Sequence, residues 1–149
     1  MGNVARRKPC PRILLVEDDP NDTFVFLSAA KGMDCIGEIM VVESGEEGLH
    51  LLEELREAPL PERPALIVVD INLPGMNGLE VLPQIRAMVE YSLTPIIVLS
   101  TSDYDPDIRT ALTRGASAYV TKLFSYPHHM ELVQAMLTFW CRYAARTEA

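Results

Sequence analysis

Acidic residues, a lysine and two hydroxyl side chains each follow a short apolar run in this chain of 149 residues. In chain order they are Glu17, Asp18 and Asp19 after RILLV, Asp70 after ALIVV, Ser100 and Thr101 after PIIVL, and Lys122 after SAYVT. Carboxylates that lie close together raise one another's pKa unless a cation neutralises them, and Mg²⁺ prefers such oxygen ligands. An ion, a lysine and a hydroxyl in one place could each contact an oxygen of a phosphoryl group. The pattern therefore indicates phosphoryl chemistry, which depends mainly on positioning and charge neutralisation.

Asp70 is the residue that we expect to react, because a carboxylate can act as a nucleophile and form an aspartyl phosphate. The segment INLPGMNG follows it directly. Pro74 and Gly75 occupy the second and third positions of a predicted turn. That turn would fix the loop and direct the backbone carbonyl of Asn72 towards the metal. Gly78 then begins a helix close to the backbone.

Apolar strands alternate with helices along the chain. The strands are predicted at residues 12–16, 38–42, 65–69, 95–100 and 117–121. Helices are predicted at residues 21–31, 78–89, 106–114 and 127–145. Another helix is predicted to begin at a capping box formed by Ser44 and Glu47. This alternation favours an α/β fold whose parallel sheet is covered on both faces.

Right-handed crossovers leave few topologies for such a chain. We expect a doubly wound, five-stranded parallel sheet in the order 2-1-3-4-5, in which strands one and three are neighbours where the winding reverses. Ligands bind at this crevice in open α/β sheets. The polar residues that end the strands should therefore gather at one edge.

Composition limits the classes of protein that the chain could belong to. Hydrophobic residues make up 48% of the chain, which is typical of a folded domain. We expect one domain at residues 12–149 after a flexible tail at residues 1–11. The net charge of −8 argues against nucleic-acid binding. No apolar run reaches the ~18 residues of a membrane span. Scattered Cys10, Cys35 and Cys141 suggest reduced thiols, so a cytoplasmic location is expected.

Two adjacent histidines, His128 and His129, stand near the start of the last predicted helix. Adjacent residues point to different faces of a helix, so we do not expect the pair to share a metal ion.

Four motifs are similar to those of one family. They are ILLVEDD, IVVDINLPGMNGLEVL, VLSTS and GASAYVTK. Over roughly residues 12–145 the chain resembles the receiver domain of two-component response regulators. The order 2-1-3-4-5, with its flavodoxin-like winding, is also that of the family, so the expected strand order does not rest on the pattern alone.

The resemblance implies a role for each matching residue. Asp70 matches the phosphoacceptor, Lys122 the family lysine, Ser100 the switch hydroxyl and Tyr119 the aromatic switch residue. The implied ligands of Mg²⁺ or Mn²⁺ are Glu17, Asp18, Asp70 and the backbone carbonyl of Asn72. Asp19 is better interpreted as a helix-capping carboxylate.

The chain departs from the family pattern at two positions. Leu123 stands where the family usually has a proline after a cis peptide bond, so both the cis and the trans form are open here. Thr101 is bulkier than the usual Ala or Gly. We expect it to narrow the access of water and slow the loss of the phosphoryl group, so that Thr101→Ala shortens the lifetime of the phosphorylated state.

The motifs most resemble those of single-domain regulators associated with bacteriophytochromes. The resemblance implies phosphorelay signalling, in which a sensor histidine kinase, with a bacteriophytochrome as the candidate, phosphorylates the chain. Few residues follow the last predicted helix, so the expected output is a protein-interaction surface that changes on phosphorylation.

Apolar residues cover roughly 200° of that last helix, more than one core face requires. They form two stripes: Leu132, Met136, Phe139 and Tyr143, and Val133, Leu137, Trp140 and Ala144. A homodimer through this helix and a wide buried face are both compatible with the pattern.

Other classes of protein share parts of this pattern. A dehalogenase-type, Mg²⁺-dependent phosphatase needs a second aspartate two residues after the nucleophile, where this chain has Asn72. A flavin-binding domain needs a phosphate-cradling loop, but EDDPND is acidic. A pseudo-receiver that only binds partners would normally lack one of the acidic residues or Lys122. We therefore expect a phosphoacceptor and not an enzyme.

Overall fold

Five parallel strands form the centre of the structure, a computed structural model that describes residues 10–145. They are β1 (Arg12–Val16), β2 (Ile39–Val42), β3 (Pro64–Val69), β4 (Ile96–Ser100) and β5 (Ala118–Thr121). The strand order is β2-β1-β3-β4-β5, and every neighbouring pair is parallel. The predicted doubly wound α/β fold is thus confirmed.

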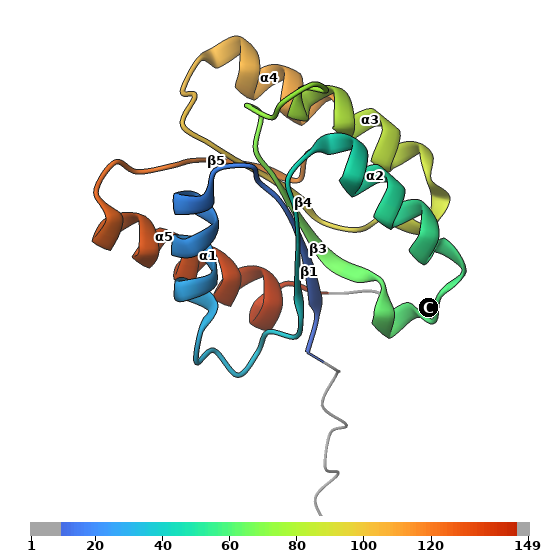
Figure 1. The fold of residues 1–149 in the computed structure, drawn as a ribbon, viewed down its shortest axis with the longest axis horizontal. Helices are drawn as coiled ribbons and strands as arrows, with labels where there is room; N and C mark the ends of the chain where they lie inside the picture. The colour runs from blue at the N-terminus through green and yellow to red at the C-terminus, as the bar shows by residue number, and fades with distance from the viewer. Residues whose placement is uncertain (1–9, 146–149) are drawn as a thin grey trace, which may run out of the picture.

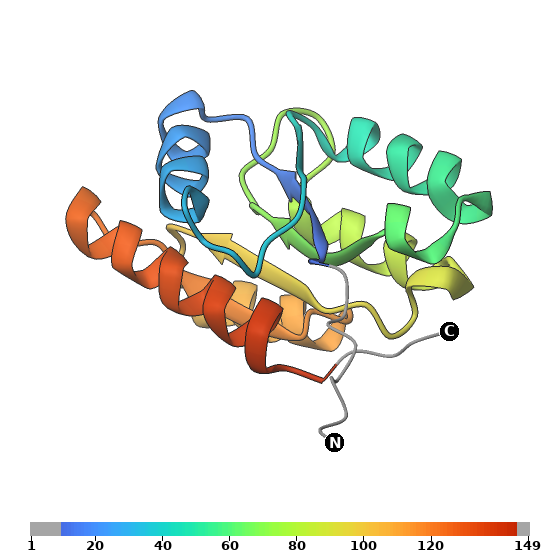
Figure 2. The same ribbon diagram turned by 90° about the horizontal axis from the view of Figure 1, so that it is seen from below.

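Four α-helices connect the strands and a fifth follows the last strand. Together they cover both faces of the sheet (Figures 1 and 2). They are α1 (Pro20–Ala30), α2 (Gly45–Glu54), α3 (Gly78–Ala87), α4 (Asp105–Thr113) and α5 (Tyr126–Thr138). Short 3₁₀ segments lie at Leu55–Glu57, Leu60–Glu62 and Val89–Tyr91. Helices α1 and α5 pack on one face, and α2, α3 and α4 on the other.

Strands β3 and β4 lie in the interior of the sheet, which explains their continuous apolar runs in the sequence. Residues 66–69 of β3 and 96–99 of β4 are all at most 4% exposed, because helices cover both faces of the sheet. Alternate residues point to the two cores. Ile67 and Val69 belong to the α2–α3–α4 side, while Leu66 and Val68 belong to the α1–α5 side.

Polar side chains cap α1 and α2 at their amino-terminal ends. The Asp19 carboxylate accepts hydrogen bonds from the backbone N–H groups of Asn21 and Asp22, so the predicted capping role is confirmed. Ser44 caps α2 by accepting from the Glu47 N–H. Glu47 completes the box one residue earlier than predicted, because its carboxylate accepts from the N–H of Glu43.

The predicted ends of two helices are wrong. Helix α3 stops at Ala87, and Met88 has an extended backbone before a 3₁₀ turn. Helix α5 stops at Thr138 and continues as a π-helical turn at Phe139–Tyr143 instead of running to residue 145. The wider turn ends with the Ala144 N–H bonded to the Phe139 carbonyl at 2.7 Å. Apolar residues continue through this turn, so periodicity does not mark the change.

Three other expectations concern the backbone and the ends of the chain. Residues 10–145 contain no cis peptide bond, so the bond between Lys122 and Leu123 is trans. The predicted tail at residues 1–11 lies outside the described residues except for Cys10 and Pro11, which bond to the segment before β2 through Asp34 and Gly37. No helix in the described part of the chain is long and apolar enough to cross a bilayer.

Candidate functional site

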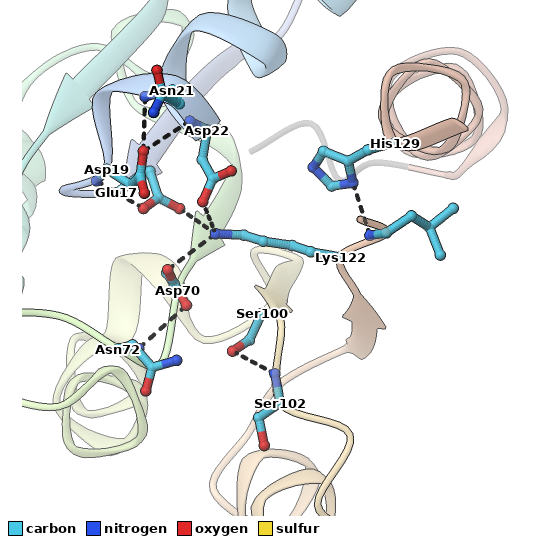
Figure 3. Close-up of polar contacts among 11 residues, drawn as sticks. Glu17, Asp19, Asn21, Asp22, Asp70, Asn72, Ser100, Ser102, Lys122 and His129 are labelled. Carbon is cyan, nitrogen blue, oxygen red and sulfur yellow. Dashed lines mark hydrogen bonds and ion pairs between the residues drawn. The ribbon is translucent and has the colours of Figure 1, made fainter. Parts of the chain in front are cut away.

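The carboxyl ends of β1, β3 and β5 bring acidic residues and a lysine together (Figure 3). Strand β1 lies next to β3, so Glu17 and Asp18 come close to Asp70. Carboxylate oxygens of these three residues lie within 4.8 Å of one another. The predicted crevice at the switch point of the sheet therefore exists.

Glu17 and Asp70 are buried in this cluster, whereas Asp18 is exposed. Burial raises the pKa of Glu17 to about 7; the charge on Asp70 adds to the rise and Lys122 opposes it. Buried carboxylates are disfavoured unless a positive charge lies close to them. Three oxygen ligands with one open side fit a hard divalent cation, and no other group of three potential ligands exists among the residues described.

Backbone contacts fix the position of Asp70. Its N–H donates to the carbonyl of Val16, and its Oδ1 atom accepts from the N–H of Asn72 at 3.2 Å. Gly78 lies against the Asp70 carbonyl: a Cβ atom at position 78 would lie 2.0 Å from that oxygen. Only glycine leaves room for this close approach.

The loop between Asp70 and α3 is held near its α3 end. Gly75 has a φ of +68°, which agrees with the predicted turn at Pro74 and Gly75. The Met76 N–H donates to Glu46 of α2 at 3.1 Å, and Asn77 caps α3 through the Leu79 N–H. Glu46 was not identified from the sequence, because its role depends on how α2 packs beside the loop.

Lys122 is the centre of the hydrogen bonds in Figure 3. Its Nζ atom donates to Glu17 Oε2 at 2.8 Å, to Asp22 Oδ2 at 2.8 Å and to Asp70 Oδ2 at 3.1 Å. The residue is only 6% exposed. Burial by itself would lower the pKa of Lys122, but the bonds to Asp22 and Glu17 and the charge on Asp70 outweigh it, so the pKa is raised. The lysine is therefore cationic.

Asp22, in the first turn of α1, contacts Lys122 but was not identified as a site residue from the sequence. The acidic run EDD indicates a site at the end of β1, whereas the sequence places Asp22 only in the helix that follows. Its carboxylate reaches Lys122 because the Asp19 cap fixes the first turn of α1 in the required orientation. Its position three residues after that cap was the available signal.

Ser100 and Tyr119 belong to one network around Ser102. Ser100 is fully buried at the end of β4, and its Oγ accepts from the Ser102 N–H at 3.4 Å. The Tyr119 hydroxyl donates to the Ser102 carbonyl at 2.7 Å. Ser102 Oγ donates to Asp107 in the first turn of α4, also at 2.7 Å. Ser102, which was not assigned a role from the sequence, thus joins both predicted switch residues to α4. Thr101 is exposed beside it.

His129 braces the segment after Lys122, while His128 is exposed, so the two side chains point to different faces as predicted. The His129 Nδ1 atom accepts the N–H of Leu123 at 3.3 Å. Burial lowers the pKa of His129; Asp22 opposes this effect and Lys122 reinforces it. A neutral imidazole is the form that can accept this bond.

A doubly wound sheet with acidic residues and a buried lysine at its carboxyl edge defines an α/β domain built to hold a cation and a phosphoryl group. The sequence matches the family model for the response regulator receiver domain over residues 13–135. The chain belongs to this family. It is therefore a receiver module of phosphorelay signalling and not a classical enzyme, which sets aside the dehalogenase-type and flavin-binding alternatives.

Individual relatives agree with this assignment. The chain is 30% identical to response regulator Rcp1 of Synechocystis sp. over 128 residues, which cover 86% of this chain and 87% of Rcp1. The crystal structure of the phosphorylated cyanobacterial phytochrome response regulator RcpA matches with a TM-score of 0.85 at 30% identity, and the Mn²⁺-bound form of Rcp1 with 0.84 at 28% identity. Each match covers 93% of this chain and 99% of the other. The predicted resemblance to phytochrome-associated regulators is confirmed.

Proposed function

We propose that this receiver domain, at residues 12–149, accepts a phosphoryl group on Asp70 and then changes a protein-interaction surface. The observation that carries the proposal is the meeting of a buried lysine and three clustered carboxylates at the carboxyl edge of the sheet. A pseudo-receiver without phosphoryl chemistry would have no need of this arrangement.

Asp70 is the proposed nucleophile. One of its carboxylate oxygens forms a bond to phosphorus, and the bond from phosphorus to the donor nitrogen breaks. The electron pair of that bond stays on the histidine imidazole, which takes a proton from solvent. The backbone contacts of Asp70 hold the carboxylate in place, so the transfer depends on positioning more than on movement of the acceptor.

Glu17, Asp18, Asp70 and the backbone carbonyl of Asn72 are the proposed ligands of a divalent cation, for which we propose Mg²⁺. When bound, such an ion neutralises charge on the phosphoryl oxygens. The clustered carboxylate oxygens support three of these ligands, Glu17, Asp18 and Asp70, and a relative of this chain, Rcp1, was crystallised with Mn²⁺.

Lys122 and Ser100 are proposed to contact the phosphoryl oxygens that the metal ion does not contact. Lys122 already donates a hydrogen bond to Asp70 Oδ2, one of the two carboxylate oxygens to which the phosphoryl group could be transferred. Movement of Ser100 towards that group would disturb the bond from Ser102 and, through Ser102, the contacts of Tyr119 and α4. The output surface is therefore proposed to lie around α4 and β5. Thr101 is proposed to limit the access of water.

The proposed partners follow from this chemistry. A sensor histidine kinase supplies the phosphoryl group, and the similarity to RcpA, a phytochrome response regulator, favours a bacteriophytochrome. We place the reaction in the cytoplasm. A second copy of the chain is the proposed partner of the last helix, where Phe139 and Tyr143 are 53% and 70% exposed.

Acetyl phosphate tests the proposal without a kinase. Incubation with Mg²⁺ should add about 80 Da to the intact protein, and removal of the cation with a chelator should abolish the addition. Asp18→Asn should slow the addition at limiting Mg²⁺, whereas Glu57→Gln, at an exposed acid outside the cluster, should not. Equal labelling with and without divalent cation would overturn the metal-assisted mechanism.

A further inference from the structure

Three carboxylates share the ammonium group of Lys122, and one of them has no part in the proposed reaction. Glu17 and Asp70 are proposed metal ligands, and Asp70 is also the proposed phosphoacceptor. Asp22 is not among the acids whose oxygens lie within 4.8 Å of one another. It nevertheless bonds to Lys122 Nζ at 2.8 Å, closer than Asp70 at 3.1 Å.

The position of Asp22 is set by the fold and not by the pocket. Its N–H donates to the capping carboxylate of Asp19 in the first turn of α1. Helix α1 is held in turn against α5, where Phe26 and Ala29 share a buried core with Val133 and Leu137. In Figure 3 the Asp22 side chain descends from this turn onto the end of the lysine.

The charges around the other two carboxylates would change during the reaction. A cation would bind to Glu17 and Asp70, and a phosphoryl group would occupy an oxygen of Asp70. Both events would weaken the attraction between those carboxylate oxygens and the Lys122 ammonium group. The hydrogen bond that Lys122 donates to Asp22 depends on neither event, and a charge-assisted hydrogen bond is stronger than a neutral one.

We propose that Asp22 is a positioning residue, which holds the Lys122 ammonium at the place where the phosphoryl oxygens arrive. This inference rests on the proposed function of Asp70 and Lys122. Without the carboxylate, the long lysine side chain has more rotamers available, and the ammonium is in place for a smaller share of the time. Asp22 acts through Lys122 and does not contact the phosphoryl group.

The rate of phosphorylation by acetyl phosphate and Mg²⁺ tests this role. Asp22→Ala should slow the reaction roughly tenfold, the scale of one charge-assisted hydrogen bond. Asp22→Asn keeps an acceptor of the same shape without the charge and should lie between the wild type and Asp22→Ala. It also guards against an Asp22→Ala variant that fails to fold. Glu131→Gln removes a charge at an exposed position of α5 outside the acid cluster, so it should stay within about twofold of the wild type.

A second arm separates positioning from a general structural effect. In a Lys122→Met background, Asp22→Ala should cause no further slowing, because its partner is already absent. Equal slowing in both backgrounds would overturn the inference, as would Asp22 variants that react as fast as or faster than a wild-type protein that is itself labelled. If the wild type takes no label at all, the proposed function fails and the inference falls with it.

Discussion

Gly78, at the residue scale, determines how closely α3 approaches Asp70. A Cβ atom there would overlap with the Asp70 carbonyl oxygen at 2.0 Å, and the overlap is with backbone, which cannot rotate away. Gly78→Ala must therefore displace Asp70 or α3. We expect a loss of about 1–3 kcal/mol in the free energy of unfolding, measured by urea denaturation. Phosphorylation by acetyl phosphate should slow by roughly tenfold or more.

Gly48 offers a matched control, since it is also a buried glycine in a helix. Its Cβ would meet a methyl group of Val16 at 3.2 Å, and a side chain can adjust. Gly48→Ala should leave the phosphorylation rate nearly unchanged. Identical rates for the two variants would contradict the role given to Gly78.

His129 should make stability depend on pH. Its pKa is lowered in the folded state, mainly by burial, so the neutral form is favoured by folding. The stabilisation is complete above the unfolded pKa of ~6.5 and is lost as pH falls towards the folded pKa. His129→Asn keeps an acceptor for the Leu123 N–H but does not titrate. We therefore expect the wild type to lose more unfolding free energy than His129→Asn between about pH 7 and about pH 5.

Exposed His128 supplies the control for this comparison. His128→Asn should follow the pH profile of the wild type in the same urea titrations. A His129→Asn profile as steep as that of the wild type would show that another group is responsible.

Sequence reasoning at this scale identified the residues that end strands. Asp70, Lys122, Glu17 and Asp18 follow apolar runs directly, and the sheet brings them together without further information. Asp22 and Ser102 could not be found in this way, because their contacts depend on the rotation of α1 and on the path of the loop after β4.

At the scale of single elements, α3 contains a proline whose cost is partly offset from outside the helix. Pro83 has no N–H to donate to the carbonyl of Leu79, four residues earlier. Arg114 donates to that carbonyl instead, at 3.0 Å. Pro83→Ala should restore the helical bond and raise the free energy of unfolding by about 1–3 kcal/mol, measured by urea denaturation.

The hydrogen bond from Arg114 to the Leu79 carbonyl predicts that the effects of substitutions at Pro83 and Arg114 on stability are coupled. Arg114→Ala should destabilise the wild type more than it destabilises Pro83→Ala, because the Leu79 carbonyl then has a partner within the helix. A double-mutant cycle measures the difference directly. Equal effects of Arg114→Ala in both backgrounds would argue against the compensation.

Strand and helix types were predictable, whereas helix ends were less so. Continuous apolar runs identified β3 and β4, since both faces of these strands are buried. The predicted end of α5 was wrong because the π-helical turn at Phe139–Tyr143 has the same apolar composition as the helix before it. Within that turn Cys141 is buried in the core, and Arg142 forms an exposed ion pair with Asp34 in the segment before β2.

At the scale of the whole molecule, the apolar width of the last helix has two parts. One part is the core face, where Val133, Met136 and Leu137 are buried. Phe139 and Tyr143 are exposed, and Phe139 packs edge-to-face on Trp140 with ring centroids 5.1 Å apart. Exposed aromatic residues are common at protein interfaces, where a few of them supply most of the binding energy.

The proposed homodimer is tested by the sedimentation of variants. We expect the wild type to associate, and Phe139→Ala and Tyr143→Ala each to weaken association by roughly tenfold. Leu93→Ala, at an apolar residue that is 76% exposed after α3, should have no effect. A wild type that sediments as a monomer at every concentration would contradict the dimer but not the phosphoryl chemistry.

The α/β class of the fold could be predicted from the alternation of strands and helices, because a parallel sheet with right-handed crossovers leaves few arrangements. The strand order 2-1-3-4-5 rested in part on the family resemblance. The acid cluster followed from that fold, since Glu17, Asp18 and Asp70 end neighbouring strands. How the last helix meets a second molecule could not be predicted, because the same apolar stripe serves burial and association.

The position of the phosphoryl group is the most direct test of this account. After reaction with acetyl phosphate and Mg²⁺, an aspartyl phosphate can be reduced to homoserine and located by mass spectrometry of the peptides. We predict homoserine at position 70 alone, and none in Asp70→Asn. A label on Glu17 or Asp18, or undiminished labelling of Asp70→Asn, would contradict the assignment of Asp70 as the phosphoacceptor.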